Sequence, residues 1–132
     1  MTDSVQLLRA LADETRLRIL ALLARRELCV CQIVEVLDIG QSKASRHLAH
    51  LRNVRLVSDR REGPWIHYSL AEADGDLHRR MLQWLRQAEN EIPMAASDAK
   101  ALANVVACEK LCTDETSATE IAREEDVSAA IS

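Results

Sequence analysis

The stretch SKASRHLAHLRNVRLVSDRREGPWIHYSL, Ser42 to Leu70, decides the fold of this 132-residue chain. Its first part predicts a helix from about Gln41 to Val54, because small and apolar residues recur there at helical spacing. The stripe that this helix is expected to bury consists of Ala44, Leu48 and Leu51. The other faces carry hydrogen-bonding or charged side chains, namely Gln41, Ser42, Lys43, Ser45, Arg46 and His47.

The second part of the stretch predicts a β-hairpin. Two short segments with alternating apolar and polar residues, Leu56–Arg60 and Trp65–Leu70, read as strands. Arg61-Glu62-Gly63-Pro64 joins them, and its glycine and proline are typical of a turn. Arg60 and Arg61 give the hairpin positive charge.

Three helices are predicted before this stretch. The first covers Val5–Ala12, and Asp13 then stands where the N-cap of a second helix belongs. Arg25 and Arg26 close the second helix, where positive charge is favourable. The third helix is expected to begin near Leu28, with apolar residues spaced i, i+3, i+4 and i+7 at Val30, Ile33, Val34 and Leu37. A short turn, Asp38-Ile39-Gly40, separates it from the helix at 41–54.

Two helices, a tight turn and a basic hairpin are the pattern of a winged helix-turn-helix, although an ordinary amphipathic helix and hairpin would look alike. In that fold the helix at 41–54 lies in the DNA major groove, and the hairpin arginines reach the backbone or minor groove. The residues predicted to contact DNA are Gln41, Ser42, Lys43, Ser45, Arg46, His47, Arg60 and Arg61.

The C-terminal part predicts two more helices. A helix over about Asp74–Ile92 has a wide apolar stripe and should end at Pro93. Since a stripe that wide needs cover, a partner subunit is expected on it. Ser97 can cap a last helix that reaches about Cys112. We therefore divide the chain into a DNA-binding and dimerisation domain, 1–92, and a segment, 93–132, with a helix carrying a cysteine pair and an acidic, disordered tail.

Composition narrows the class of protein. Hydrophobic residues make up 48% of the chain but aromatic residues only 2%, which suits a mainly α fold with a small β-hairpin wing. The net charge is −4, but the charges are unevenly distributed, with a basic block at 41–61 and an acidic block at 109–126. No signal peptide or membrane span is visible, so we expect a cytoplasmic protein without membrane association, whose four cysteines are thiols or metal ligands.

Two stretches closely resemble the ArsR/SmtB family of arsenical-resistance repressors: Ser42–Leu70 and ALADETRLRILALLARRELCVCQIVEVL, Ala10–Leu37. The resemblance covers about residues 5–92. It implies a homodimer, joined through the first and fifth helices, that represses transcription by binding double-stranded operator DNA at an imperfect palindrome. Gly40 and Asn53-Val54-Arg55 depart from the family pattern, which affects the expected operator sequence.

Glu27-Leu28-Cys29-Val30-Cys31-Gln32 is similar to the inducer-binding box of the family's arsenite, cadmium and lead sensors. Soft ions prefer thiolate sulfur, and a helix start favours the thiolate. Because i and i+2 point about 200° apart on an α-helix, binding one ion through Cys29 and Cys31 is expected to unwind or bend the start of the third helix.

The third cysteine of the best-known arsenite box is replaced by Val34. Cys108 and Cys112 are the other two cysteines, four residues apart and so on one helix face. Three interpretations follow. One tail cysteine completes an arsenite site, all four cysteines bind Cd(II) or Pb(II), or the two pairs are separate sites.

The same sequence allows other functions. Asp76 and His78 match half of the family's zinc site, but Glu89 and Ile92 stand where its other ligands belong. A redox-sensing repressor that uses Cys29 and Cys31 remains an alternative, as does an interaction module that no longer reads DNA. No nucleotide-binding loop, hydrolase nucleophile or paired catalytic carboxylates are recognisable, so neither an enzyme nor an organic cofactor is expected.

Overall fold

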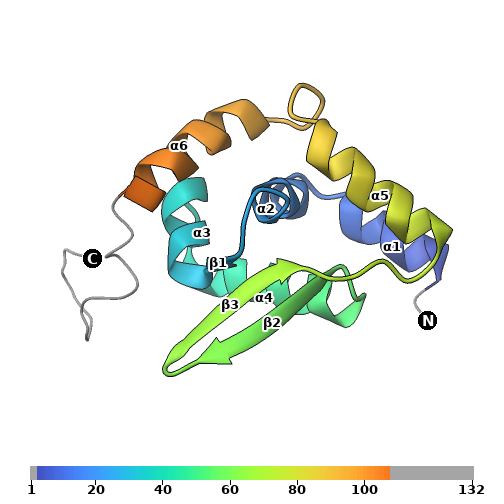
Figure 1. Ribbon diagram of the computed structural model, residues 1–132, viewed down its shortest axis with the longest axis horizontal. Helices are drawn as coiled ribbons and strands as arrows, with labels where there is room; N and C mark the ends of the chain where they lie inside the picture. Colours follow the sequence, from blue (N-terminus) through green and yellow to red (C-terminus); the bar gives the residue numbers. More distant parts are fainter. Residues whose placement is uncertain (1–2, 108–132) are drawn as a thin grey trace.

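The computed structural model describes residues 3–107, which form six helices and a three-stranded antiparallel sheet. In chain order the elements are α1 (Ser4–Leu11), α2 (Glu14–Leu23), β1 (Leu28–Cys29), α3 (Val30–Leu37), α4 (Gln41–Asn53), β2 (Val57–Glu62), β3 (Trp65–Leu70), α5 (Asp76–Gln87) and α6 (Ala95–Ala107). Figure 1 shows α2 at the centre, with α3 and α6 on one side and α1 and α5 at the other end. The predicted winged helix-turn-helix is confirmed.

Local sequence accounts for the helix-turn-helix unit. Asp13 caps α2 as predicted, because its Oδ2 accepts the Arg16 N–H at 2.9 Å. Asp38 ends α3 in the left-handed conformation, with φ 55° and ψ 51°, which Asp tolerates better than most residues. α4 then begins after Gly40 and turns Ala44, Leu48 and Leu51 inward, each fully buried.

The sheet has one strand more than the predicted hairpin. Its order is β1-β3-β2, and β1 pairs with β3 through Leu28↔Tyr68 and Cys29↔His67. The third helix was therefore expected to begin too early, near Leu28, whereas it begins at Val30. Two residues are too few to show the alternation by which a strand is recognised in a sequence.

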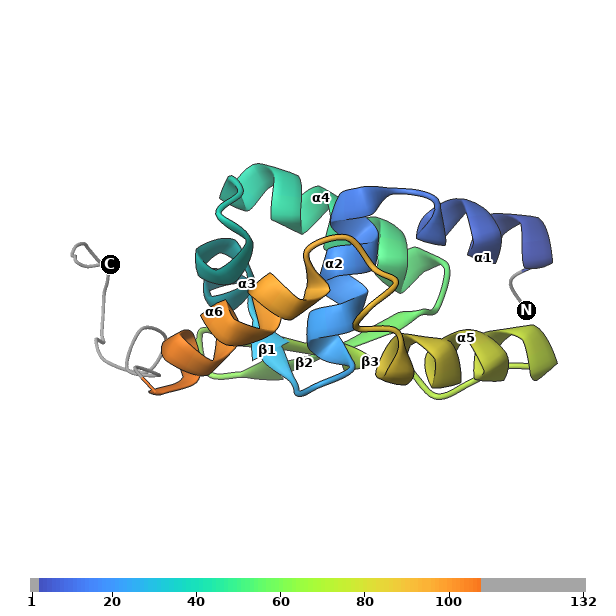
Figure 2. The same cartoon turned by 90° about the horizontal axis from the view of Figure 1, so that it is seen from above.

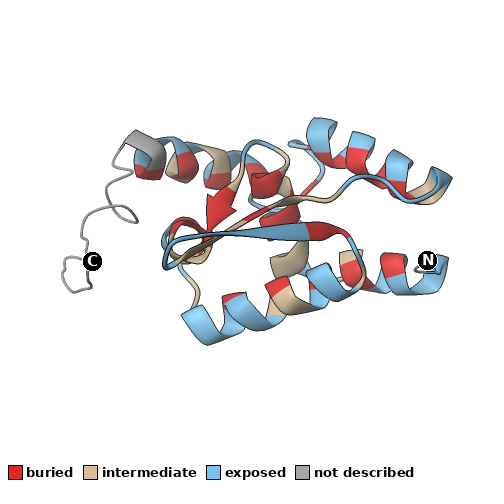
Figure 3. Cartoon of the chain, turned by 60° about the horizontal axis from the view of Figure 1, so that its bottom comes forward, coloured by how far each residue is buried: buried red, intermediate tan, exposed pale blue. Residues whose placement is uncertain are grey.

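The core is aliphatic and centred on α2. Ile19, Leu20, Leu48, Leu51 and Leu56 have no exposed surface. Buried residues face inward along each helix, and the outer strand β2 is exposed over most of its length (Figure 3). No described helix is long and apolar enough to cross a membrane.

The C-terminal helices differ from the prediction at their boundaries. α5 ends at Gln87, well before Pro93, and the N–H of Ile92 bonds to the Ala88 carbonyl in a tight turn. Burial explains this, because Ile92 and Ala95 are 4% and 7% exposed and a continued helix would carry them away from the core. α6 begins at Ala95, before Ser97, and its expected end near Cys112 lies outside the described residues.

α6 packs against α2 and α3 (Figure 2). A buried ion pair holds it there. The Arg18 guanidinium donates to both carboxylate oxygens of Asp98, each at 2.9 Å. Only 4% of the Asp98 side chain and 13% of the Arg18 side chain are exposed. These hydrogen bonds raise the pKa of Arg18 above its usual value.

Replacing Asp98 with Ala is expected to lower the free energy of unfolding by about 3 kcal/mol, because it leaves a buried guanidinium without its partner. Urea denaturation followed by circular dichroism measures the change. Glu89→Ala removes a carboxylate that pairs with Arg25 on the surface and is the control, with an expected loss below about 1 kcal/mol. Equal losses in the two variants would contradict this account of α6.

Candidate DNA-reading surface and thiol pair

The outer face of α4 presents the residues that were predicted to contact DNA. Five of them are exposed, namely Gln41, Ser42, Lys43, Ser45 and Arg46. The buried stripe of the same helix packs on α2, α3 and β2, so the exposed face is held on a rigid support. A groove-reading helix needs this combination, because hydrogen bonds to base edges depend on accurate placement.

His47 differs from the other five, because it is half-buried and lies against the start of α2. Its Nδ1 is 3.5 Å from Nη1 of Arg16, which also donates to the carbonyls of Arg9 and Ala10. Burial lowers the pKa of His47, and the nearby Arg16 lowers it further. His47 therefore connects the recognition helix to the α1–α2 corner.

The wing arginines have different surroundings. Arg61 is exposed on β2. Arg60 is paired with Glu27, through Nη2–Oε1 at 2.7 Å and Nε–Oε2 at 3.2 Å, and also with Glu62 at 3.4 Å. The contact with Glu27 was not predicted, because 33 residues separate the two and no local pattern reports a cross-sheet contact. Arg52 of α4 also reaches β2, at 2.9 Å from Asp59.

Cys29 and Cys31 lie at the junction of β1 and α3. Cys29 is the N-cap residue of α3, in an extended conformation with φ −91° and ψ 168°, and Cys31 is in the first helical turn. Their Sγ atoms are 2.8 Å apart. The premise that both cysteines lie within a regular helix was wrong, because Cys29 is extended and the two sulfurs meet without unwinding of α3. The extended N-cap already places both on one side.

Gln32 holds this junction and was missed by the sequence analysis. Its Oε1 accepts the Cys29 N–H at 3.0 Å, and the residue is only 7% exposed. The signal was present, since Gln three residues after an N-cap is half of a capping box. Recognising it required knowing that Cys29, an unusual capping residue, ends the strand.

Known proteins are similar in sequence to this chain. The family model of bacterial regulatory proteins of the arsR family matches residues 13–59. The arsenic resistance transcriptional regulator ArsR2 of Pseudomonas putida is 37% identical over 109 residues, 76% of this chain and 93% of the relative. The chain belongs to the ArsR family.

Further comparisons agree with this membership. The arsenical resistance operon repressor of Escherichia coli is 53% identical over 68 residues, 51% of this chain and 58% of its own length. The structure of HlyU from Vibrio cholerae superposes with a TM-score of 0.58 at 35% identity, covering 67% of this chain and 92% of HlyU. A homodimeric winged helix-turn-helix domain from Mycobacterium bovis gives a TM-score of 0.55 at 32% identity, covering 66% of this chain and 78% of its own.

The two other cysteines of this ArsR-family chain, Cys108 and Cys112, lie outside the described residues. The half-match to a zinc site is not completed in the part of the chain that is described. Asp76 pairs with Arg79 and Arg80, and Nδ1 of His78 accepts the Asp74 N–H at 3.0 Å. Residues 3–107 contain no group of three or more side chains placed to hold a metal.

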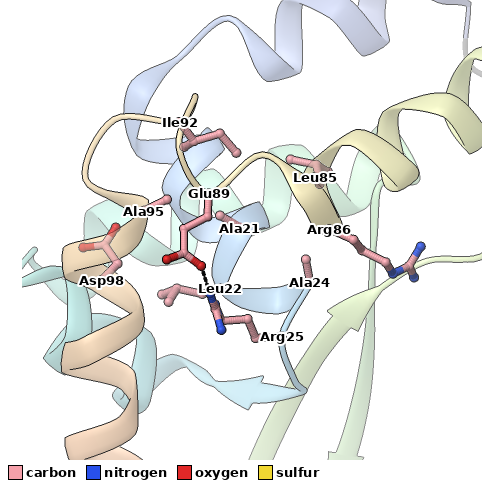
Figure 4. Close-up of a pocket in the computed structure, with 10 residues that line it drawn as sticks. All are labelled: Ala21, Leu22, Ala24, Arg25, Leu85, Arg86, Glu89, Ile92, Ala95 and Asp98. Atoms are coloured by element: carbon pink, nitrogen blue, oxygen red, sulfur yellow. Dashed lines mark hydrogen bonds and ion pairs between the residues drawn. The ribbon is translucent and has the colours of Figure 1, made fainter.

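A pocket of about 120 Å³ lies between α2, α5 and α6 (Figure 4). Arg25, Arg86, Glu89 and Asp98 are its polar lining, and Arg25 and Glu89 are joined in an ion pair. None of the predicted DNA-contacting residues or cysteines lines it. The pocket is therefore separate from both candidate sites of this ArsR-family chain.

Arg46→Ala is expected to weaken binding to the chain's own promoter DNA about tenfold, because a side chain that is predicted to read a base edge is lost. Fluorescence anisotropy with labelled duplex measures the Kd. Arg86→Ala removes the same charge from an exposed position on α5 and is the matched control. An equal weakening in both variants would show that Arg46 contributes only general charge.

Folding stability is expected to fall as the pH drops below about 6.5, because burial lowers the pKa of His78 in the folded protein. The unfolded chain then takes up a proton that the folded chain does not, so acid favours unfolding until the folded-state pKa is passed. Urea denaturation from pH 8 to 5 measures this. His78→Asn, which keeps an acceptor for the Asp74 N–H, should reduce the dependence, and an unchanged slope would contradict the assignment.

Proposed function

We propose that the chain is a transcriptional repressor that binds operator DNA as a homodimer and releases it when arsenite binds Cys29 and Cys31. The observation that carries this proposal is the pair of sulfurs, 2.8 Å apart, at the start of a helix that packs against the recognition helix. A ligand of the sulfurs therefore binds at the start of α3, the helix that packs directly against the DNA-reading helix α4. The similar arsenical resistance repressors support the same assignment.

DNA binding is assigned to α4 and the wing. The exposed residues on α4 reach base edges in the major groove, and Arg61 contributes phosphate affinity from the wing. We place Arg60 in the same surface, on the condition that its guanidinium leaves Glu27 when phosphate binds. His47 positions α4 and contacts DNA only at the margin of the site, since it is half-buried.

Dimerisation is assigned to α1 and α5. Both lie at the same end of the molecule in two views (Figures 1 and 2). Large apolar side chains are exposed on them, with Val5 and Leu8 each 54% exposed and Trp84 37% exposed. Exposed apolar side chains on two helices at one end of the molecule favour cover by a second copy. The similar Mycobacterium bovis domain is homodimeric.

Arsenite suits the thiol pair chemically. It reaches the protein as As(OH)₃, and each thiol that binds replaces one hydroxyl and releases one water, with no change in oxidation state. Two cysteines leave one As–OH, and a third thiol would replace it. α6 packs on α3 and is described as far as Ala107, so Cys108, the next residue in the sequence, is the first candidate for the third ligand, and Cys112 is the second. Binding of Cd(II) or Pb(II) by all four cysteines is the alternative.

The closeness of the two sulfurs also favours a second candidate function, repression controlled by thiol oxidation. Cys29 and Cys31 are near enough to form one disulfide with little movement, which would be reversed by a thiol reductant. Arsenite and oxidation differ in their chemistry. Arsenite acts under reducing conditions and is removed by a competing dithiol, whereas oxidation needs an oxidant and lowers the free-thiol count.

Arsenite is expected to raise the Kd for promoter DNA about 10- to 100-fold at one equivalent per subunit, a coupling typical of such regulators. Cys29→Ser should bind DNA normally and not respond, since its oxygen does not replace a soft-ion ligand. Anisotropy under reducing conditions measures both. Release of DNA by cadmium alone would favour a site made of all four cysteines. Release only after treatment with diamide would favour redox control. The variants Cys108→Ser and Cys112→Ser would identify the third arsenite ligand.

A further inference from the structure

The thiol pair is connected to the wing by a row of paired residues across the sheet. Cys29 pairs with His67 on β3, and His67 pairs with Arg60 on β2. Residues directly opposite one another project from the same face of a sheet. Cys29 therefore lies one strand away from His67 and two strands away from Arg60, in a single register.

Glu27 closes this row with an ion pair. It stands immediately before β1, two residues from Cys29, and its two carboxylate oxygens accept from Nη2 and Nε of Arg60 at 2.7 and 3.2 Å. The contact reaches across β3 and is bidentate. A guanidinium held in this way offers its two best-placed donors to Glu27, and these donors are the ones that a phosphate would take.

Glu27 is the principal acidic partner of Arg60. Arg60 also contacts Glu62 at 3.4 Å, through the single atom Nη1, and Glu62 lies 3.2 Å from His67. The hydrogen bond from Arg60 lowers the pKa of Glu27, and the positive charge of Arg60 lowers it further. The Glu27 carboxylate thus occupies the two guanidinium donors that a phosphate would use. Glu27 is also attached to the strand that carries Cys29.

We infer that Glu27 couples the thiol pair to the wing by competing with DNA phosphate for Arg60. The inference rests on the proposed function, because it assumes that the wing binds DNA and that Cys29 binds the inducer. In the absence of arsenite, Arg60 exchanges Glu27 for phosphate when DNA arrives. A ligand on Cys29 shifts β1 and, with it, Glu27. The shift favours the ion pair between Glu27 and Arg60 over the contact between Arg60 and phosphate. The route to release then runs through the sheet as well as through α3.

Two variants test this inference. Glu27→Gln keeps the shape and one acceptor oxygen but removes the charge that competes with phosphate. Glu72→Gln removes the same charge from an exposed position between β3 and α5 and reports the general effect of net charge. Anisotropy with promoter duplex is measured for both variants and wild type, at several salt concentrations, with and without arsenite.

The expected results are specific to Glu27. Relative to Glu72→Gln, the Glu27→Gln variant should bind DNA about two- to fivefold more tightly, as the loss of a surface ion pair permits. Its slope of log K against log salt should equal that of wild type, because Arg60 contacts the same phosphate in both proteins once DNA is bound. Arsenite should change its Kd by a smaller factor than it changes that of wild type. In an Arg60→Gln background the Glu27 substitution should change DNA binding no more than Glu72→Gln does.

The outcomes separate the inference from the proposed function. If wild type does not bind the duplex, or binds and does not respond to arsenite, the proposed function fails first. If wild type binds and responds, a Glu27→Gln affinity equal to that of Glu72→Gln would overturn the competition. An undiminished response to arsenite in Glu27→Gln would overturn the coupling.

Discussion

The pairing of Leu28 and Cys29 with β3 is the constraint on which the candidate site depends. It keeps Cys29 extended, so α3 begins at Val30 and not near Leu28, and the two sulfurs lie on the same side. The same two residues join the helix-turn-helix to the wing. Without this short strand, both cysteines would belong to one helix.

On the surface assigned to DNA, some basic side chains are exposed and others are held in ion pairs. Lys43, Arg46 and Arg61 are exposed, whereas Arg52 and Arg60 lie in ion pairs with acids on neighbouring elements. Solvent-exposed ion pairs are weak and exchange readily for phosphate, so these acids adjust affinity without preventing binding. A small acidic protein can in this way present a basic face without an excess of positive charge.

The C-terminal helix is fixed by a different kind of interaction. The chain turns back after α5 because Ile92 and Ala95 bury themselves in the core, and the Arg18–Asp98 pair then orients α6 across α2 and α3. Such a buried pair costs desolvation and contributes little net stability, but it is intolerant of losing one partner. Orientation is its main consequence, and it brings the end of α6 to the side of the molecule where α3 lies (Figure 1).

The sequence by itself determined the elements whose signals are local. Asp13 as a cap, the buried stripe of α4 and the Gly63-Pro64 turn each follow from the properties of a few neighbouring residues, and they predicted the helices, the hairpin and the exposed α4 residues. The resemblance to the ArsR/SmtB family decided between a winged helix-turn-helix and an ordinary helix followed by a hairpin. Only the tertiary structure decided where β1 lies, which way Cys29 turns, that Arg60 meets Glu27, and where α5 ends. These depend on contacts between residues far apart in the chain, and neither periodicity nor a capping preference reports such a contact.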